Sequence, residues 1–214
     1  MGGAPVVDAP RPRGRPRDQD SAETRLRLLR VAQELFARHG YEATSNRTIA
    51  KASGITSGAI YHYFSSKAEL YAAVYEVVFD KVFTEFEKAV AEHNTLFGQY
   101  AAVLEAAATL NREDPLLPAF VIGVAGDSER HPELKPLLRP LRRRNNEFFR
   151  RLVSQAARRG ELRSDVDQRA VEDLLNAVVS GLARLSAITG DSRRHTAAVD
   201  ALQRFFAGTL LTTS

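Results

Sequence analysis

Within residues 44–67, six of the side chains that can donate hydrogen bonds stand where they could contact a nucleic acid. They are Arg47, Thr56, Ser57, Tyr61, His62 and Lys67. Their hydroxyl, imidazole, guanidinium and ammonium groups suit phosphate oxygens and the hydrogen-bonding edges of bases. We therefore expect non-covalent recognition of a nucleic acid, with Arg47 and Lys67 on phosphates and the other four side chains available to bases.

The stretch that carries these side chains has the pattern of two short helices joined by a tight turn. Thr44 and Ser45 can cap the first helix, and Gly54 supplies the left-handed backbone that ends it. Thr56 or Ser57 can then cap a second helix. A major groove about 12 Å wide admits one helix, whose N-terminal residues contact the bases. The pattern predicts a helix-turn-helix that binds double-stranded DNA.

Residues on both sides of this motif resemble the tetracycline-repressor-like (TetR) family of bacterial transcription regulators. The matching positions are Leu28, Leu29, Ala32, Leu35, Phe36, His39, Gly40, Tyr41, Glu42, Ala43, Thr44, Ile49, Ala50, Ala52, Gly54, Ile55, Gly58, Tyr61, His62, Tyr63, Phe64, Ser66, Lys67, Ala68, Glu69 and Leu70. Their single ungapped register makes the resemblance specific, and it covers the first third of the chain. The sequence departs from the family at Asn46, where an apolar residue is usual, and at Ser57, where Lys, Arg or Pro is frequent.

Residues 1–20 read as a flexible arm, because they are rich in Pro, Gly and Arg and show no periodicity. Within the arm, Arg13 and Arg15 belong to the run Pro-Arg-Gly-Arg-Pro, which looks like the core of an AT-hook. In that motif two arginines enter a narrow A·T minor groove, whose negative potential attracts them. The alternative is a solubilising tail that contacts phosphates without preference.

Positive charge is concentrated near the predicted motif. Residues 11–67 hold eleven Lys or Arg and five acids, whereas the rest of the chain holds nineteen bases and twenty-one acids. The overall net charge is only +4. This uneven distribution is expected of a protein that binds a polyanion.

The remaining sequence predicts an all-α protein, because apolar residues recur at helical spacing and strand-like alternation is nowhere sustained. Residues 21–66 are predicted to form a three-helix, helix-turn-helix DNA-binding domain, and residues 67–214 a larger helical ligand-binding and dimerisation domain. Helices are expected at about 67–93 and 97–110. A short helix should follow Pro115 and end before Gly123, and prolines at 132, 136 and 140 should delay the next helix until about Leu141.

Two C-terminal helices, Asp167–Thr189 and Arg193–Leu211, carry apolar residues on more than one stripe. A surface helix needs only one apolar face, so the surplus must be covered by another element. The family resemblance implies that a second copy covers it, through a four-helix contact that closes a homodimer. The alternative is burial of both helices in the centre of a monomer.

The resemblance also implies a small-molecule pocket in the larger domain. The candidate lining residues are Tyr75, Phe79, Phe83, Phe86, Tyr100, Leu104, Phe120, Phe148, Leu152 and Asn176. All could equally be ordinary core, and Asn176 could instead serve an interface or a backbone contact. Because most of these candidates are aromatic, we expect an apolar or aromatic effector.

Other classes of protein fit the sequence poorly. The five His residues are scattered without metal-ligand spacing, no phosphate-binding glycine loop is present, and there is no Cys. We expect no catalytic residue, no metal and no cofactor. No apolar run reaches the ~18 residues of a membrane span, so we expect a cytoplasmic, nucleoid-associated protein with no membrane partner.

The sequence thus predicts a homodimeric, ligand-responsive regulator that binds a palindromic operator, as a repressor or, depending on operator position, an activator. Two alternatives remain. An architectural DNA-binding protein would use the Arg-rich arm and lack a ligand pocket. A ligand-binding or catalytic helical protein with a vestigial helix-turn-helix would not bind DNA.

Overall fold

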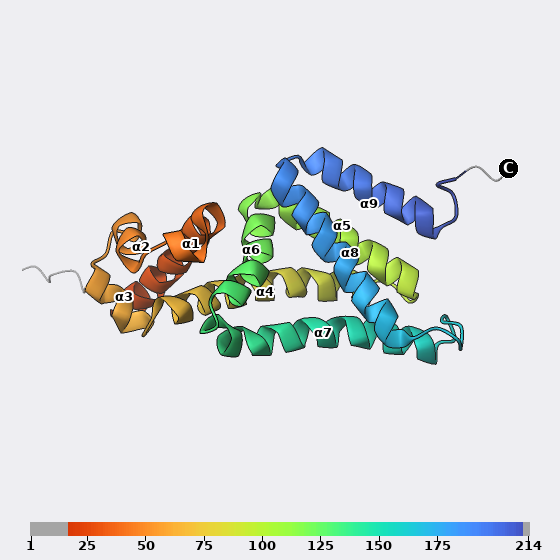
Figure 1. The fold of residues 1–214 in the computed structure, drawn as a ribbon, viewed down its shortest axis with the longest axis horizontal. Helices are drawn as coiled ribbons and strands as arrows, with labels where there is room; N and C mark the ends of the chain where they lie inside the picture. The colour runs from red at the N-terminus through yellow and green to blue at the C-terminus, as the bar shows by residue number, and fades with distance from the viewer. Residues whose placement is uncertain (1–16, 212–214) are drawn as a thin grey trace, which may run out of the picture.

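The computed structural model describes residues 17–211, which form nine α-helices arranged as an elongated molecule (Figure 1). The helices are α1 Arg17–Ala43, α2 Asn46–Ser53, α3 Ser57–Tyr63, α4 Lys67–Ala91, α5 Leu96–Glu113, α6 Leu116–Arg130, α7 Leu134–Arg158, α8 Gln168–Thr189 and α9 Ser192–Phe206. Helices α1–α3 occupy one end, and α4 extends from them into the larger helical part. The expected all-α fold, with a helix-turn-helix domain and a larger helical domain, is confirmed.

The first three helices begin and end where local chemistry dictates. Gly40, at φ 78°, breaks the regular backbone near the end of α1. The Ser45 hydroxyl caps α2 by accepting from the Thr48 amide at 3.1 Å, and Gly54 ends α2 at φ 69°. The Thr56 hydroxyl caps α3 by accepting from the Ala59 amide at 3.2 Å. Only α1 differs from expectation, because it starts at Arg17, inside the segment predicted as an arm.

Two of the middle helices are longer than the sequence indicated. Helix α6 continues through Gly123 and Gly126, because Val124 between them packs in the N-terminal core and the polar residues Asp127 and Ser128 beyond them are buried as well. Helix α7 starts at Leu134 instead of Leu141, with Pro140 inside it. Pro136 falls in the first turn, where a missing amide breaks no helical hydrogen bond, so only Pro140 removes one.

The last two helices follow the predicted spans except at the C-terminal end. Asp167 caps α8 through its carboxylate, which accepts from the Arg169 amide at 2.8 Å. Helix α9 ends at Phe206 and not at Leu211, because Gly208 adopts φ 68° and the Thr209 amide donates back to the Arg204 carbonyl. This pairing is a Schellman end, which satisfies the last carbonyls of the helix.

The buried apolar side chains form two cores. The N-terminal core joins α1–α3 to the first half of α4 and to residues of α6 and α7. The C-terminal core lies between the second half of α4 and α5, α7, α8 and α9. Helix α4 is therefore shared, and α6 packs against both α1 and α8. A movement of α4 or α6 must affect both ends of the molecule.

Candidate DNA interface and internal cavity

The polar side of α3 is open to solvent, while its apolar side is packed. Tyr61 is 59% exposed, and Ser57 and His62 are also exposed. Behind them, Ile60 and Phe64 are buried in the N-terminal core. The arrangement fixes the helix from inside and leaves its donors facing outward, as a groove-binding helix requires.

Two of the predicted DNA contacts already have partners within the protein. The Thr56 hydroxyl accepts the capping hydrogen bond of α3, which leaves its proton for another acceptor. The Lys67 ammonium donates to the Tyr41 carbonyl at 2.9 Å and lies 4.1 Å from the centre of the Tyr41 ring. Lys67 therefore fastens the end of α1 to the start of α4. Arg47, by contrast, is exposed on the first turn of α2.

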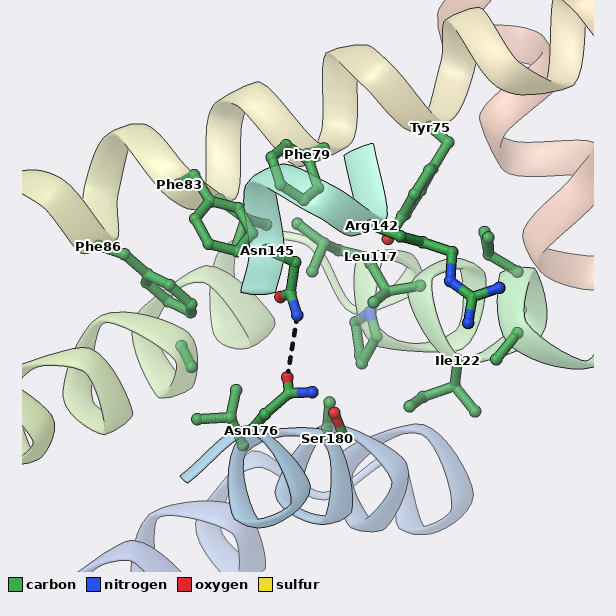
Figure 2. Close-up of a pocket in the computed structure, with 18 of the residues that line it drawn as sticks. Tyr75, Phe79, Phe83, Phe86, Leu117, Ile122, Arg142, Asn145, Asn176 and Ser180 are labelled. Carbon is green, nitrogen blue, oxygen red and sulfur yellow. Dashed lines mark hydrogen bonds between the residues drawn. The ribbon is translucent and has the colours of Figure 1, made fainter. Parts of the chain in front are cut away.

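A cavity of about 460 Å³ lies among α4, α5, α6, α7 and α8 (Figure 2). This volume is in the range of pockets that enclose small molecules. Tyr75, Phe79, Phe83 and Phe86 line one wall along α4. The rings of Phe79 and Phe83 are stacked, with their centres 4.1 Å apart. An apolar surface of this kind suits a flat or extended hydrocarbon body.

Polar groups interrupt this apolar lining. The Asn145 side-chain amide donates to the Asn176 amide oxygen at 3.2 Å, which links α7 to α8 across the cavity (Figure 2). Asn111 and Ser128 also line the cavity and are buried, yet the Asn111 Nδ2 and Ser128 Oγ atoms have no hydrogen-bond partner in the described chain. Buried polar groups normally have partners, so these two unpaired atoms, enclosed by the protein beside the cavity, are unusual.

The cavity brings together half of the predicted pocket residues. Tyr75, Phe79, Phe83, Phe86 and Asn176 line it. The other five candidates do not line it, because they pack elsewhere. They are Tyr100, Leu104, Phe148 and Leu152, which lie in the C-terminal core, and Phe120, which lies in the N-terminal core.

The hydroxyl of Tyr100 illustrates why an aromatic residue on an apolar helix need not face a pocket. It donates to the Leu175 carbonyl at 2.8 Å, and burial raises the pKa of the hydroxyl above its ordinary value. Phe120 instead packs with its ring centre 5.5 Å from that of Tyr71. Both side chains therefore stabilise helix packing.

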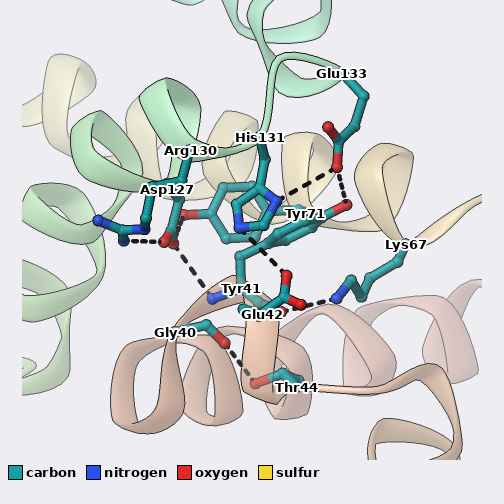
Figure 3. Close-up of polar contacts among 10 residues, drawn as sticks. All are labelled: Gly40, Tyr41, Glu42, Thr44, Lys67, Tyr71, Asp127, Arg130, His131 and Glu133. Carbon is teal, nitrogen blue, oxygen red and sulfur yellow. Dashed lines mark hydrogen bonds and ion pairs between the residues drawn. The ribbon is translucent and has the colours of Figure 1, made fainter.

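A buried polar junction joins α6 to the DNA-binding end (Figure 3). One oxygen of the Asp127 carboxylate accepts from the Tyr71 hydroxyl at 2.8 Å and from the Tyr41 amide at 3.3 Å. Its other oxygen accepts from Arg130 at 2.7 Å. Burial, followed by the hydrogen bond to Asp127, raises the pKa of the Tyr71 hydroxyl. Asp127 thus ties the end of α1 and the first part of α4 to α6.

The outer side of this junction carries further charge. The Tyr41 hydroxyl donates to Glu133 at 3.4 Å, and burial, with the Glu133 charge second, raises the Tyr41 pKa to about 12. The His131 ring packs edge-on against Tyr41, with its nitrogens 3.4 Å from Glu42 and 3.7 Å from Glu133. Tyr41 is therefore held by contacts on three sides, from α4, α6 and the turn that follows α6.

Sequence reasoning missed the polar cavity residues and the junction. Asn145 could have been found, since it stands four residues after Leu141 and three before Phe148, on the apolar stripe of α7. Asn111 likewise follows Leu104 by seven residues. Asp127 offers no such signal, because acids are ordinary near helix ends. Arg13 and Arg15 lie outside the described residues.

Residues 17–211 contain neither a cluster of metal-ligating side chains nor a helix suited to cross a membrane. No group of three or more His, Asp or Glu side chains in this part of the chain is placed to hold a metal ion. None of the helices described here has both the length and the apolar character that spanning a membrane requires.

The fold and these sites define a helix-turn-helix protein with an internal, ligand-sized cavity, and comparison with known proteins gives its family. Residues 28–74 match the model of bacterial regulatory proteins of the tetR family, and residues 99–211 match that of the C-terminal region of BetI-type transcriptional repressors. The chain belongs to the TetR family of DNA-binding transcriptional regulators.

Individual relatives agree with this assignment. The transcriptional repressor KstR2 of Rhodococcus jostii is 30% identical over 157 residues, which cover 71% of this chain and 75% of the relative. The regulator UidR of Escherichia coli is 25% identical over 163 residues, which cover 76% of this chain and 81% of UidR. The structure of Salmonella enterica GusR superposes with a TM-score of 0.71 at 28% identity and covers 88% of this chain and 95% of that one. These relatives are transcriptional regulators, which is a non-enzyme class.

Proposed function

We propose that this regulator binds a palindromic operator as a homodimer, represses transcription from it, and is released by a small, largely apolar ligand in the cavity of Figure 2. The observation that carries the DNA part is the exposure of Ser57, Tyr61 and His62 on a helix whose apolar side is locked into the core. Repression is favoured because the C-terminal family model and KstR2 are both described as repressors.

In the proposed complex, two copies of α3 enter successive major grooves on one face of the duplex. Thr56, Ser57, Tyr61 and His62 contact base edges, while Arg47 contacts phosphate. Lys67 contributes positive charge from its position against Tyr41, and reaches phosphate only by leaving that contact. Two-fold symmetry places the half-sites about 34–36 Å apart, or at a multiple of that spacing.

The dimer is proposed to form through α8 and α9, the helices predicted as Asp167–Thr189 and Arg193–Leu211. Leu174 and Ile188 on α8 are 53% and 71% exposed, and Phe205 on α9 is 58% exposed. Exposed apolar side chains grouped on two adjacent helices indicate a surface that a partner covers. A second copy would cover the same surface on each chain, which closes the assembly at two subunits.

Arg13 and Arg15 are proposed to enter an A·T-rich minor groove beside each half-site. The arm precedes the helix-turn-helix, and an arm at that position can reach around the duplex. Deleting residues 1–16 is expected to weaken binding to A·T-flanked operators more than to G·C-flanked ones. If the deletion weakens binding to both kinds of operator equally, the arm contacts only phosphates and does not distinguish A·T from G·C.

Ligand action requires that the ligand bind the arrangement with low DNA affinity better than the one with high affinity. Each ~1.4 kcal/mol of that difference shifts the equilibrium tenfold. Helix α6 lines the cavity and also carries Asp127, which holds α1 and α4. We propose that a ligand pushes or draws α6 and thereby changes the spacing of the two α3 helices.

The proposed division into a DNA-binding domain at 21–66 and a ligand-binding and dimerisation domain at 67–214 fits this coupling. The N-terminal core crosses the division, since Leu117 and Leu134 of the larger part pack in it. The two domains therefore share buried surface, and a change in one alters the packing of the other.

The experiment is selection of bound duplexes from a random pool with the full chain, repeated with Tyr61→Ala/His62→Ala. Enrichment of a palindrome by the wild type and its loss in the double variant is the expected result. Val77→Ala/Lys81→Ala, which alters exposed α4 residues, is the matched control and should select the same palindrome. Equal binding of random and palindromic duplexes would instead favour an architectural protein. No binding even at low salt would mean that the helix-turn-helix is vestigial.

A further inference from the structure

Three hydrogen-bond donors without a protein partner line the cavity, and the charge of one of them, Arg142, acts on Tyr75 and on Glu129, the residue after Ser128. They are the Tyr75 hydroxyl on α4, the Ser128 hydroxyl on α6 and the Arg142 guanidinium on α7. Ser128 is only 3% exposed, and its oxygen lacks a partner in the described chain. In Figure 2 the Tyr75 ring reaches toward the base of the Arg142 side chain, and the Arg142 charge lowers the pKa of Tyr75, which burial raises more strongly.

Arg142 is the arginine of residues 142–144 that has no carboxylate within ion-pair distance in the described chain. Arg143 lies 4.0 Å from Glu147, and Arg144 pairs with Asp80 at 2.9 Å. Glu129 is the acid near Arg142, but it pairs with Lys135 at 2.9 Å, and that hydrogen bond lowers the Glu129 pKa. Within residues 17–211, Arg142 makes neither an ion pair nor a hydrogen bond. Arg142 is exposed, so its guanidinium is a solvated positive charge beside the cavity, close enough to Glu129 to help lower the pKa of that carboxyl.

The donor set has the chemistry of a site for an oxyanion. Two hydroxyls and a guanidinium can donate four hydrogen bonds to the two oxygens of a carboxylate, and guanidinium geometry matches a carboxylate. The stacked Phe79 and Phe83 rings continue the cavity away from this end, along α4. Halfway, the Asn145–Asn176 amide pair offers one polar contact.

We infer that the effector is an amphipathic carboxylate, whose head group binds Tyr75, Ser128 and Arg142 and whose apolar body lies along the phenylalanine wall of α4. This inference deepens, and rests on, the proposed role of the cavity as the effector site. It adds a charge requirement that an apolar pocket alone would not impose.

The position of this head-group site also suggests how binding reaches the DNA interface. Ser128 follows Asp127 directly in α6, and Tyr75 stands one helical turn after Tyr71 in α4. Asp127 and Tyr71 are the pair that joins α6 to α4 in Figure 3. A carboxylate that draws Tyr75, Ser128 and Arg142 together therefore acts on the same two helices at the same level as the buried junction.

The test is titration calorimetry of the full chain with two matched pairs of probes, decanoate with 1-decanol and 4-phenylbutyrate with 4-phenyl-1-butanol. A carboxylate is expected to bind roughly 10- to 100-fold more tightly than its alcohol, as the loss of charge-assisted hydrogen bonds implies. Equal binding of acid and alcohol, or no binding of either acid at millimolar concentration, would overturn the inference. Binding of decanoyl coenzyme A without binding of decanoate would also overturn it.

Two variants locate the site. Arg142→Gln should remove most of the preference for acid over alcohol and leave alcohol binding unchanged, and Ser128→Ala should reduce the preference by a smaller factor. Arg143→Gln, on the adjacent residue, which is also exposed but does not line the cavity, should behave as the wild type. If Arg143→Gln weakens acid binding as much as Arg142→Gln, the acid is attracted by the overall positive charge of this part of the chain and not by a specific site at Arg142. These titrations need no DNA, so their outcome is separate from that of the duplex selection.

Discussion

The two cores of the molecule differ in what surrounds them. In the N-terminal core, the ring centres of Phe36, Tyr41 and Tyr71 lie 4.8 to 6.2 Å apart. Aromatic rings pack closely at the C-terminal core as well, as Phe83 and Phe148 do with centres 5.2 Å apart, but helices α8 and α9 beside it leave apolar side chains exposed. The cavity of Figure 2 lies between the two cores, because residues of both line it. The N-terminal core supports the helix proposed to contact DNA, and the exposed apolar surface beside the C-terminal core is the one proposed for a second copy.

The largest expected effect compares one phenylalanine from each core. Phe36→Ala should lower the free energy of unfolding by about 3–5 kcal/mol, because it opens a new cavity in packed surroundings. Phe83→Ala should cost roughly half as much, since one side of that ring already faces empty space. Urea unfolding followed by circular dichroism measures both. Equal losses would mean that the cavity is closed in solution.

The next effect concerns the exposed apolar side chains of the C-terminal part. Leu174→Glu/Ile188→Glu should raise the dimer dissociation constant roughly 100-fold or more, because four buried side chains per dimer become charged. Sedimentation velocity at micromolar concentration measures the change. Val77→Glu, which alters an exposed apolar residue on α4, is the control and should remain dimeric. A double variant that stays dimeric would place the interface elsewhere.

A smaller effect is expected at the junction between the two parts. Asp127→Asn should lower the free energy of unfolding by about 1–3 kcal/mol, because an amide cannot satisfy the Tyr71 hydroxyl, the Tyr41 amide and Arg130 together. It should also reduce the effect of a bound ligand on DNA affinity. Asp80→Asn, which breaks an exposed ion pair with Arg144, should cost less than about 1 kcal/mol. Similar losses for both variants would contradict a special role for the junction.

The smallest effect is a dependence of stability on pH. His195, in α9, is buried, with one ring nitrogen 3.1 Å from the Leu182 carbonyl of α8, and burial lowers its pKa. Below the ordinary His pKa of ~6.5 the unfolded chain therefore binds a proton that the native chain does not, so stability falls as the solution becomes more acidic. One such group gives a slope of at most about 1.4 kcal/mol per pH unit.

The His195 contribution can be isolated by substitution. His195→Asn should flatten the decline in unfolding free energy between pH 6.5 and pH 5 relative to the wild type, even if the variant is less stable at pH 7. Denaturant midpoints measured at half-unit intervals check this. An unchanged slope would mean that other groups cause the decline.

Sequence alone predicted the elements that depend on neighbouring residues. Ser45, Gly54 and Thr56 set the ends of α2 and α3 by hydrogen bonds and a left-handed turn within a few residues, so their types suffice. The fold class followed from the same local periodicity. The predicted end of α9 at Leu211 was wrong, because the left-handed backbone at Gly208 ends the helix before the apolar residues beyond it.

The residues that line the cavity could not be predicted from the sequence of any single helix. Phe79 and Phe120 have the same apolar character, yet one lines the cavity and the other packs on Tyr71, because the crossing of α4 and α6 decides which way each faces. Arg142 stands among three consecutive arginines, and only the positions of Glu147, Asp80 and Lys135 reveal that it is unpaired. Such facts require the packed structure.

Fluorescence anisotropy of the selected duplex, titrated with the wild-type chain at several KCl concentrations, tests the central claim most directly. If each subunit of the dimer neutralises about four phosphates, the logarithm of the binding constant should fall against the logarithm of salt with a slope near −7. A slope close to zero would contradict the account, because the exposed face of α2 and α3 would then make no contact with the DNA backbone.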